Sequence, residues 1–451
     1  MILAHGIGGV RDLPVPDWLF FWGGAVVLVL SFLALGALWK TPQLERRRSG
    51  HPLPAGLERF LRSPVLHGIL GATSAGLLVL IFLTALIGEP SSAQNLSPTF
   101  IYVIFWLGLV PVQVLFGNVW SVLNPWLAIA NGVDWVWQKL GQDWKPPVGY
   151  PARLGVWPAA FFLFCFAALE LCYAEPASPR PLALAIALYS YAMWFGMAAY
   201  GRREWDGHGN GFSVYFGLFA RIAPFGVHEG RIVLRMPFSG LSGRDSTPGM
   251  LAFVAVMLGS VGFDGFSRSS IWQDLRASVE GPYIVDQPGR AELFSTALSL
   301  AGLIGCVLVV ALAYLGAAWV AERSVRSDRS LVPEFVQSLV PIALVYAVAH
   351  YFTLLVTQGQ YALPLASDPF GFGWDLFGTL DYAPNIAPFS PTTVWYVQVG
   401  SLVAGHVAGL TVAHDRAVTI LPKRDALRSQ YALLGLMVVY TIGGLWLLSR
   451  G

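Results

Sequence analysis

Ten apolar segments, each about long enough to cross a lipid bilayer, recur along this chain of 451 residues. A helix needs about 20 apolar residues to span the roughly 30 Å hydrocarbon core. The segments are 18–38, 65–87, 99–117, 154–174, 182–200, 248–263, 293–320, 332–356, 392–414 and 431–448. Charged residues make up 12% of the chain, about half of what soluble domains carry. The sequence therefore predicts an all-α, polytopic transmembrane helix bundle of about ten spans, with no substantial soluble domain.

Lys and Arg residues are unevenly distributed between the connecting segments. If the N-terminus lies outside, 22 of the 28 fall in inner segments, within 40–62, 139–153, 202–244, 323–329 and 416–428. Basic residues accumulate on the cytoplasmic side of membrane proteins. The pattern predicts both termini outside, an acidic outer rim, and inner basic residues in contact with anionic membrane lipid. Nothing in the sequence indicates a nucleic-acid partner.

This topology divides the chain into four parts. They are an outer N-terminal segment (1–17), spans one to five (18–200), an inner interfacial segment (201–247), and spans six to ten (248–451) with outer loops at 264–292 and 357–391. The inner segment holds an amphipathic stretch at 212–222 and a predicted hairpin that begins at Arg231 and turns near 239–243. The apolar stretch 118–132 is short, so we expect it to be re-entrant or interfacial.

Polar residues inside apolar segments are functional candidates, because they are costly to bury in lipid. His350 lies in the eighth segment and His406 in the ninth, where Gly405 and Gly409 have the GxxxG spacing that lets helices approach closely. We expect the two histidines to face one another. Three alternatives then stay open: hydrogen bonds between helices, a proton relay, or a site for zinc, copper or haem iron.

Two other polar residues are expected at the membrane interface. Glu170 lies near the outer end of the fourth segment, and reaching the interface is favoured over a role in ion coupling. His414 lies near the inner end of the ninth segment, beside Asp415 and Arg416. The three cysteines lie in apolar segments without the spacing of a disulfide framework or a CxxC metal site.

Carboxylates and imidazoles also gather in the segments predicted to lie outside. The candidates are Asp264, Asp368, Asp375, His5 and His350. Together they would suit a divalent metal, zinc or copper, that activates water, with Arg268 stabilising negative charge. The loop that contains Asp368 and Asp375 is rich in glycine and aromatic residues, so we expect it to fold as a lid over the helix ends. The alternative is that these Asp residues cap helices and pair with arginines.

His5 has one further interpretation. If a longer precursor were cleaved after Ala4, the amino group and ring of His5 would chelate copper together. The short motifs of several common enzyme classes are absent from the sequence, which has no P-loop, no HExxH and no GxSxG.

Six short motifs together carry a resemblance to a known family. They are His5-Gly…Arg11-Asp12-Leu-Pro-Val-Pro, Gly117-Asn-Val-Trp-Ser-Val-Leu-Asn124-Pro-Trp, Gly262-Phe-Asp264-Gly, His350-Tyr-Phe-Thr…Gln358-Gly-Gln, Ser367-Asp-Pro-Phe-Gly and Gly405-His…Ala413-His-Asp-Arg. Over nearly its whole length the chain resembles bacterial polytopic membrane proteins, common in actinobacteria, that are labelled fenitrothion hydrolase. The resemblance implies a multi-pass protein of a bacterial plasma membrane. It also implies hydrolysis of an apolar aryl phosphorothioate triester to a nitrophenol and a dialkyl thiophosphate, without assigning catalytic residues.

Two rival functions remain open. One is a transporter or a copper- or haem-handling protein that uses His350 and His406 inside the membrane. The other is a structural or assembly subunit of a membrane complex, with partner subunits that the sequence does not identify.

Overall fold

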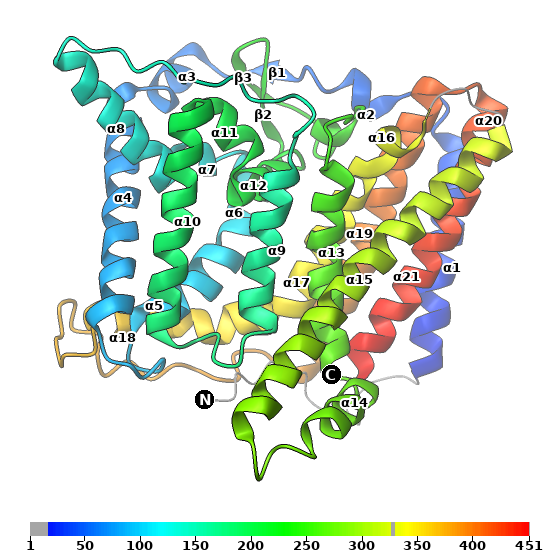
Figure 1. The fold of residues 1–451 in the computed structure, drawn as a ribbon. Coiled ribbons are helices and arrows are strands. Elements are labelled where there is room, and N and C mark those ends of the chain that lie inside the picture. Colours follow the sequence, from blue (N-terminus) through cyan, green and yellow to red (C-terminus); the bar gives the residue numbers. More distant parts are fainter. Residues whose placement is uncertain (1–16, 326–329, 451) are drawn as a thin grey trace.

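The computed structural model describes residues 17–325 and 330–450, and 72% of it is helical. Most long helices stand side by side in one bundle (Figure 1). Within the described residues, seven helical segments are long and apolar enough to cross a membrane: Ala55–Ile87, Leu96–Phe116, Pro179–Tyr200, Met250–Ser267, Pro288–Val325, Val332–Ser367 and Pro391–Ile420. Shorter apolar helical stretches are Trp22–Leu38, Trp157–Leu171 and Gly211–Ala220. The predicted all-α bundle is therefore confirmed, and its helices are those of a multi-pass membrane protein.

Each of the ten predicted segments contains a helix. In chain order these are α1 (Asp17–Leu38), α4 (Pro64–Ile87), a third unit built from α5 (Leu96–Thr99), the π-helix η2 (Phe100–Leu107) and α6 (Leu109–Phe116), α9 (Trp157–Leu171), α10 (Pro179–Tyr200), α13 (Met250–Ser267), α15 (Pro288–Val325), α17 (Val340–Gln358), α19 (Pro391–Ile420) and α21 (Tyr431–Arg450). The short helices α16 (Val332–Phe335) and η4 (Val336–Leu339) lead directly into α17.

Proline and capping residues define where many of these helices begin. Proline stands in the first turn of α4, α9, α10, α17 and α19, where its missing N–H removes no helical hydrogen bond. The side chains of Asn95, Ser269 and Ser390 accept hydrogen bonds from backbone N–H groups of the first turn that follows each of them. Such caps satisfy donors that have no partner within the helix.

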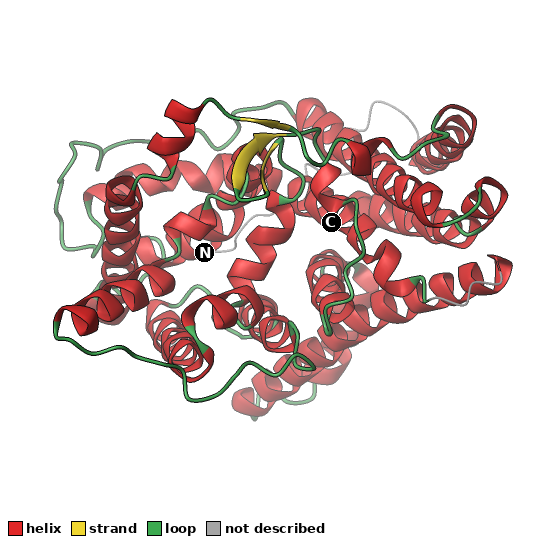
Figure 2. Cartoon of the chain, turned by 90° about the horizontal axis from the view of Figure 1, so that it is seen from above, coloured by secondary structure: helices red, strands yellow, loops and turns green. Residues whose placement is uncertain are grey.

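The helices form two neighbouring groups, seen side by side in Figure 1 and from one end in Figure 2. One group contains α4, η2, α6, α9 and α10 around α12 (Gly211–Ala220), and the other contains α1, α13, α15, α17, α19 and α21. Contacts of α9 with α13, and of α17 with η2 and α12, join the two groups. A buried surface between the groups therefore carries residues from both.

Short elements cover the two ends of the bundle (Figure 1). At one end lie α2 (Gln43–Arg46), β1 (His51–Pro52), α3 (Ala55–Leu61), α7 (Trp120–Leu123), α8 (Pro125–Lys139), α11 (Arg202–His208), β2 (Phe225–His228), β3 (Arg231–Leu234), η3 (Ser239–Leu241), α16 and α20 (Lys423–Arg428). At the other end lie α5, α14 (Ser270–Glu280), η5 (Gly359–Tyr361) and α18 (Ala362–Ser367). The stretch 118–132 contributes α7 and most of α8, which packs against α4.

The segment 201–247 differs from the prediction in two respects. A hairpin is present, but it joins β2 to β3 through Glu229 and Gly230, not through 239–243, which contains η3. Both turn residues have positive φ, the geometry of the tight hairpin turn that matches strand twist. In addition, α12 is buried in the bundle along most of its length and does not form an interfacial cap.

Two glycines of α19 allow close packing against the preceding span. A side chain at Gly405 would collide with Val345 of α17, and one at Gly409 would lie 2.7 Å from the carbonyl oxygen of Ser338. The close approach predicted from the GxxxG spacing is therefore confirmed.

Candidate acid–base site

A buried carboxylate, Asp264, lies on α13 near the end of the bundle that α14 covers. One of its oxygens accepts a hydrogen bond from Arg268 at 2.9 Å. The other lies 2.7 Å from Nε2 of His350 and accepts a hydrogen bond from the Tyr351 hydroxyl at 3.0 Å. The structure therefore brings together three candidates predicted from the sequence, Asp264, Arg268 and His350. It also adds Tyr351, which was not predicted.

Local and long-range contacts build this site differently. Arg268 lies four residues after Asp264, the spacing that places two side chains on one helix face. His350 and Tyr351 come from α17, and reach Asp264 only because α13 and α17 pack together. The first pair was visible in the sequence, whereas the second depends on the fold.

The geometry orients the imidazole of His350. When Asp264 is ionised it only accepts hydrogen bonds, so Nε2 of His350 donates and Nδ1 keeps the lone pair. The His350 side chain is 14% exposed and that of Arg268 is 27% exposed, so the site is not sealed. A carboxylate that holds an imidazole in this way produces an oriented base beside a cation.

Glu170 is the second carboxyl group of this region. It lies in the last turn of α9 and lines a small cavity between the two helix groups, together with Ser260, Tyr215 and Tyr351. The signal in the sequence was a lone acid inside an apolar segment, which is costly unless it has a role.

His406 is fully buried, and its ring packs against Tyr346, which lies one helical turn before His350 on α17. Nδ1 of His406 lies 2.8 Å from the carbonyl oxygen of Leu402, so Nδ1 is the donor and Nε2 carries the lone pair. Nε2 has no hydrogen-bond partner among the described residues. The ring packs edge-on against Tyr346, at 5.9 Å between centroids, and near Tyr440.

Asp368 and Asp375 stabilise their own loop. Asp368 accepts hydrogen bonds from the backbone N–H groups of Phe372 and Gly373, and Asp375 accepts one from Leu380. The carbonyl oxygen of Phe370 accepts a hydrogen bond from Glu89, so the loop lies against the connection between α4 and α5. The expected folded loop is present, but none of these contacts joins Asp368 or Asp375 to Asp264, and their capping role matches the alternative interpretation.

The donors predicted for a metal do not form one cluster. Within residues 17–325 and 330–450, no group of three or more His, Cys, Asp or Glu side chains is arranged to hold a metal ion. His350 is engaged with Asp264, and His406 lies elsewhere on α19. His5 lies outside the described residues.

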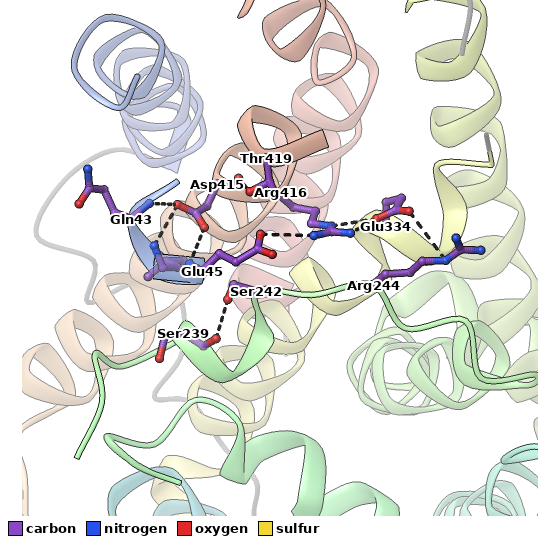
Figure 3. A network of polar contacts seen from close by, with 10 residues as sticks. Gln43, Glu45, Ser239, Ser242, Arg244, Glu334, Asp415, Arg416 and Thr419 are labelled. Carbon is purple, nitrogen blue, oxygen red and sulfur yellow. Dashed lines mark hydrogen bonds and ion pairs between the residues drawn. The ribbon is translucent and has the colours of Figure 1, made fainter. Parts of the chain in front are cut away.

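A second polar centre (Figure 3) lies beside α2 and α16, at the end of the bundle opposite to α14 (Figure 1). Asp415 of α19 is fully buried, and it accepts hydrogen bonds from the indole of Trp39 and from the backbone N–H groups of Gln43, Leu44 and Glu45. It therefore caps the first turn of α2 from a distant part of the chain.

Ion pairs extend this centre. Arg416 donates two hydrogen bonds to one oxygen of Glu334, at 2.8 and 2.6 Å, and also contacts Glu45 at 3.3 Å. Arg244 approaches Glu334 from the other side, at 3.8 Å. His414 is buried within the protein and lies between the carbonyl oxygen of Trp39 and the amide of Gln430. This network was not predicted, because its partners are far apart along the chain.

A larger, apolar cavity lies on the other face of α9. Its volume is about 680 Å³, and aromatic and aliphatic side chains of α4, η2, α9, α10 and α12 line most of it. Phe166 and Leu169 face this cavity, whereas Ala167 and Glu170 face the small polar one. The apolar cavity and the Asp264 site are therefore separate.

Comparisons with protein-family models, with curated proteins and with solved structures gave no match to this chain. The site therefore has to be interpreted from its own geometry.

Proposed function

We propose that this chain is a membrane-embedded hydrolase that acts on apolar esters, of which aryl phosphorothioate triesters are the class implied by the family resemblance. The observation that carries the proposal is the Asp264–His350 pair at 2.7 Å with Arg268 beside it. An imidazole oriented by a carboxylate is a general base, and an adjacent guanidinium stabilises negative charge.

The proposed reaction assigns one role to each side chain. Nδ1 of His350 accepts a proton from a water molecule, whose oxygen forms a bond to phosphorus. The bond between phosphorus and the aryl oxygen breaks, and the nitrophenolate leaves with the bonding electron pair. Asp264 stabilises the imidazolium that forms, and Arg268 stabilises the charge that develops on the phosphoryl group.

The proposed topology puts this site at the outer face of a bacterial plasma membrane, with ten spans and both termini outside. It is supported by the grouping of the basic segments, which surround α2, α3, the sheet, α16 and α20 at one end, while α14 lies at the other (Figure 1). Basic residues favour the cytoplasmic side. A cysteine placed near residue 450 should then react with an impermeant thiol reagent in intact cells, and protection of that cysteine would contradict this orientation.

Nitrophenol release from an aryl phosphorothioate by washed membranes tests the activity. Membranes that contain the protein should release nitrophenol, and matched membranes without it should not. Release that a chelator abolishes would assign the activation of water to a metal ion, whereas release that persists would assign it to His350. Equal release from both membranes would overturn the proposed function.

Metal handling or transport is the second candidate, and one observation favours it: the buried Nε2 of His406 has a lone pair and no partner among the described residues. A histidine whose Nδ1 donates to a carbonyl group is oriented as metal-binding histidines are. If this candidate is right, the purified protein should contain zinc or copper that His406→Gln removes. Equal metal content in the two proteins would eliminate it.

A further inference from the structure

Glu170 is a partly buried carboxyl group that lines the small cavity between the two helix groups. It belongs to α9, whose sequence Trp-Pro-Ala-Ala-Phe-Phe-Leu-Phe-Cys-Phe-Ala-Ala-Leu-Glu-Leu is otherwise apolar. A carboxyl group among apolar side chains is disfavoured unless it is protonated or hydrogen-bonded. A proton or a water molecule beside Glu170 would remove this cost.

The small cavity that Glu170 lines provides space for such a partner. Its volume is about 10 Å³, about the room that one water molecule needs by the same measure. Polar side chains from four helices line it: Glu170 of α9, Tyr215 of α12, Ser260 of α13 and Tyr351 of α17. Buried water typically makes two to four hydrogen bonds to groups of this kind.

Tyr351 connects this cavity to the acid–base site. Its hydroxyl donates to Asp264 at 3.0 Å and can still accept a hydrogen bond from the cavity side. Asp264 in turn contacts His350. A water molecule in the cavity is therefore separated from Asp264 by a single hydroxyl group.

We propose that this cavity holds one water molecule that carries protons between Glu170 and the Asp264–His350 pair. In one transfer, protonated Glu170 gives its proton to the water, the water gives one of its own to the oxygen of Tyr351, and the Tyr351 proton passes to Asp264. The water molecule and Tyr351 each gain one proton and lose one, so the net result is the movement of one proton from Glu170 to the Asp264–His350 pair. The reverse transfer would remove the proton that His350 collects, but the proposal does not depend on ester hydrolysis.

Titratable or charged groups lie near Glu170 on several of the neighbouring helices. They are Tyr102 of η2, Tyr215 of α12, Asp264 and Arg268 at the end of α13, and Tyr351 of α17, and His350 of α17 contacts Asp264. The protonation of Glu170 and that of the Asp264–His350 pair are therefore coupled by charge as well as by the proposed water.

Infrared difference spectroscopy of the purified full-length protein, recorded as the pH is changed, tests the proposal. We expect a carboxyl C=O band that Glu170→Gln removes, and an O–H band of an isolated water that shifts in H₂¹⁸O and is lost in both Glu170→Gln and Tyr351→Phe. Glu175→Gln is the matched control, because Glu175 lies in the exposed connection after α9, and it should leave both bands in place.

A measurement without any substitution keeps the test valid if a variant fails to fold. In the wild-type protein labelled with [¹³C]glutamate, the carboxyl C=O band should shift to lower frequency. A pH-dependent carboxyl band that neither the label nor Glu170→Gln changes would overturn the proposal, and so would a water band that survives both cavity variants.

Discussion

Asp264 and Asp415 are buried carboxylates toward opposite ends of the same bundle, and their donors differ in kind. Asp415 is held by an indole and by backbone N–H groups, none of which gains or loses a proton. Asp264 is held by an imidazole and a phenol, together with a guanidinium. Fixed donors around a carboxylate stabilise one structure, whereas titratable donors let protons move. The Asp415 centre therefore stabilises the fold, whereas the Asp264 site is the one for which we propose a chemical role.

The largest expected effect is on activity at the Asp264 site. Asp264→Asn removes the negative charge that orients His350, so nitrophenol release should fall by about 10²- to 10⁴-fold while the folded yield stays close to that of the wild type. Asp368→Asn is the control, because Asp368 stabilises only its own loop. Equal losses of nitrophenol release in Asp264→Asn and Asp368→Asn would contradict a specific role of Asp264 in the reaction.

The next effect is on stability at the Asp415 centre. Asp415→Ala leaves Trp39 and the first turn of α2 without their acceptor. Each unsatisfied buried donor costs about 1–3 kcal/mol, so we expect the free energy of unfolding to fall by about 3 kcal/mol. Thermal unfolding in detergent measures this change, with the exposed Asp143→Ala as control. An unchanged melting temperature would contradict the structural role.

The contact between α17 and α19 links the two centres, because α17 carries His350 and α19 carries Asp415. Gly405→Ala would push a methyl group into Val345, and overpacking of this kind costs about 1–3 kcal/mol. Gly400→Ala has open space around it and should be neutral or slightly stabilising. Thermal unfolding of the pair distinguishes tight packing from a general effect of removing a helix glycine, and equal melting temperatures would refute the close contact.

The smallest effect concerns Asp245, which lies outside the spans and pairs with Arg221 at 3.0 Å. Burial raises the pKa of Asp245, but hydrogen bonds from Thr247 and the charge of Arg221 outweigh burial and lower the pKa below its ordinary 3.8. A lowered pKa means that the ionised form stabilises the fold above about pH 4, and that this contribution is lost as the pH falls further.

Asp245→Asn should therefore cost about 1 kcal/mol or less at pH 7. The difference from the wild type in melting temperature should shrink at pH 3. A difference in melting temperature that grows on acidification would contradict a stabilising role for the ionised Asp245–Arg221 pair.

The helices could be predicted from the sequence because a lipid-spanning helix consists of one continuous apolar segment. All ten segments contain a helix, and the spacing of Gly405 and Gly409 predicted their close contact with α17. The segment of α12 was misassigned because a short apolar helix has the same composition whether it lies at an interface or inside a bundle.

The sites were less predictable because they join distant parts of the chain. The four-residue spacing of Asp264 and Arg268 was visible, but the contact of Asp264 with His350 spans 86 positions and depends on how α13 and α17 pack. The cap that Asp415 provides for α2 spans 371 positions at Leu44.

A matched pair of histidine variants tests the central comparison most directly. His350 and His414 are both hydrogen-bonded imidazoles in the bundle, one at each polar centre. Nitrophenol release should be measured for the purified wild type, His350→Gln and His414→Gln, each per mole of folded protein. The account predicts release by the wild type, at least about a 100-fold loss in His350→Gln, and near wild-type release by folded His414→Gln. No release by the wild type, or full release by His350→Gln, would contradict it.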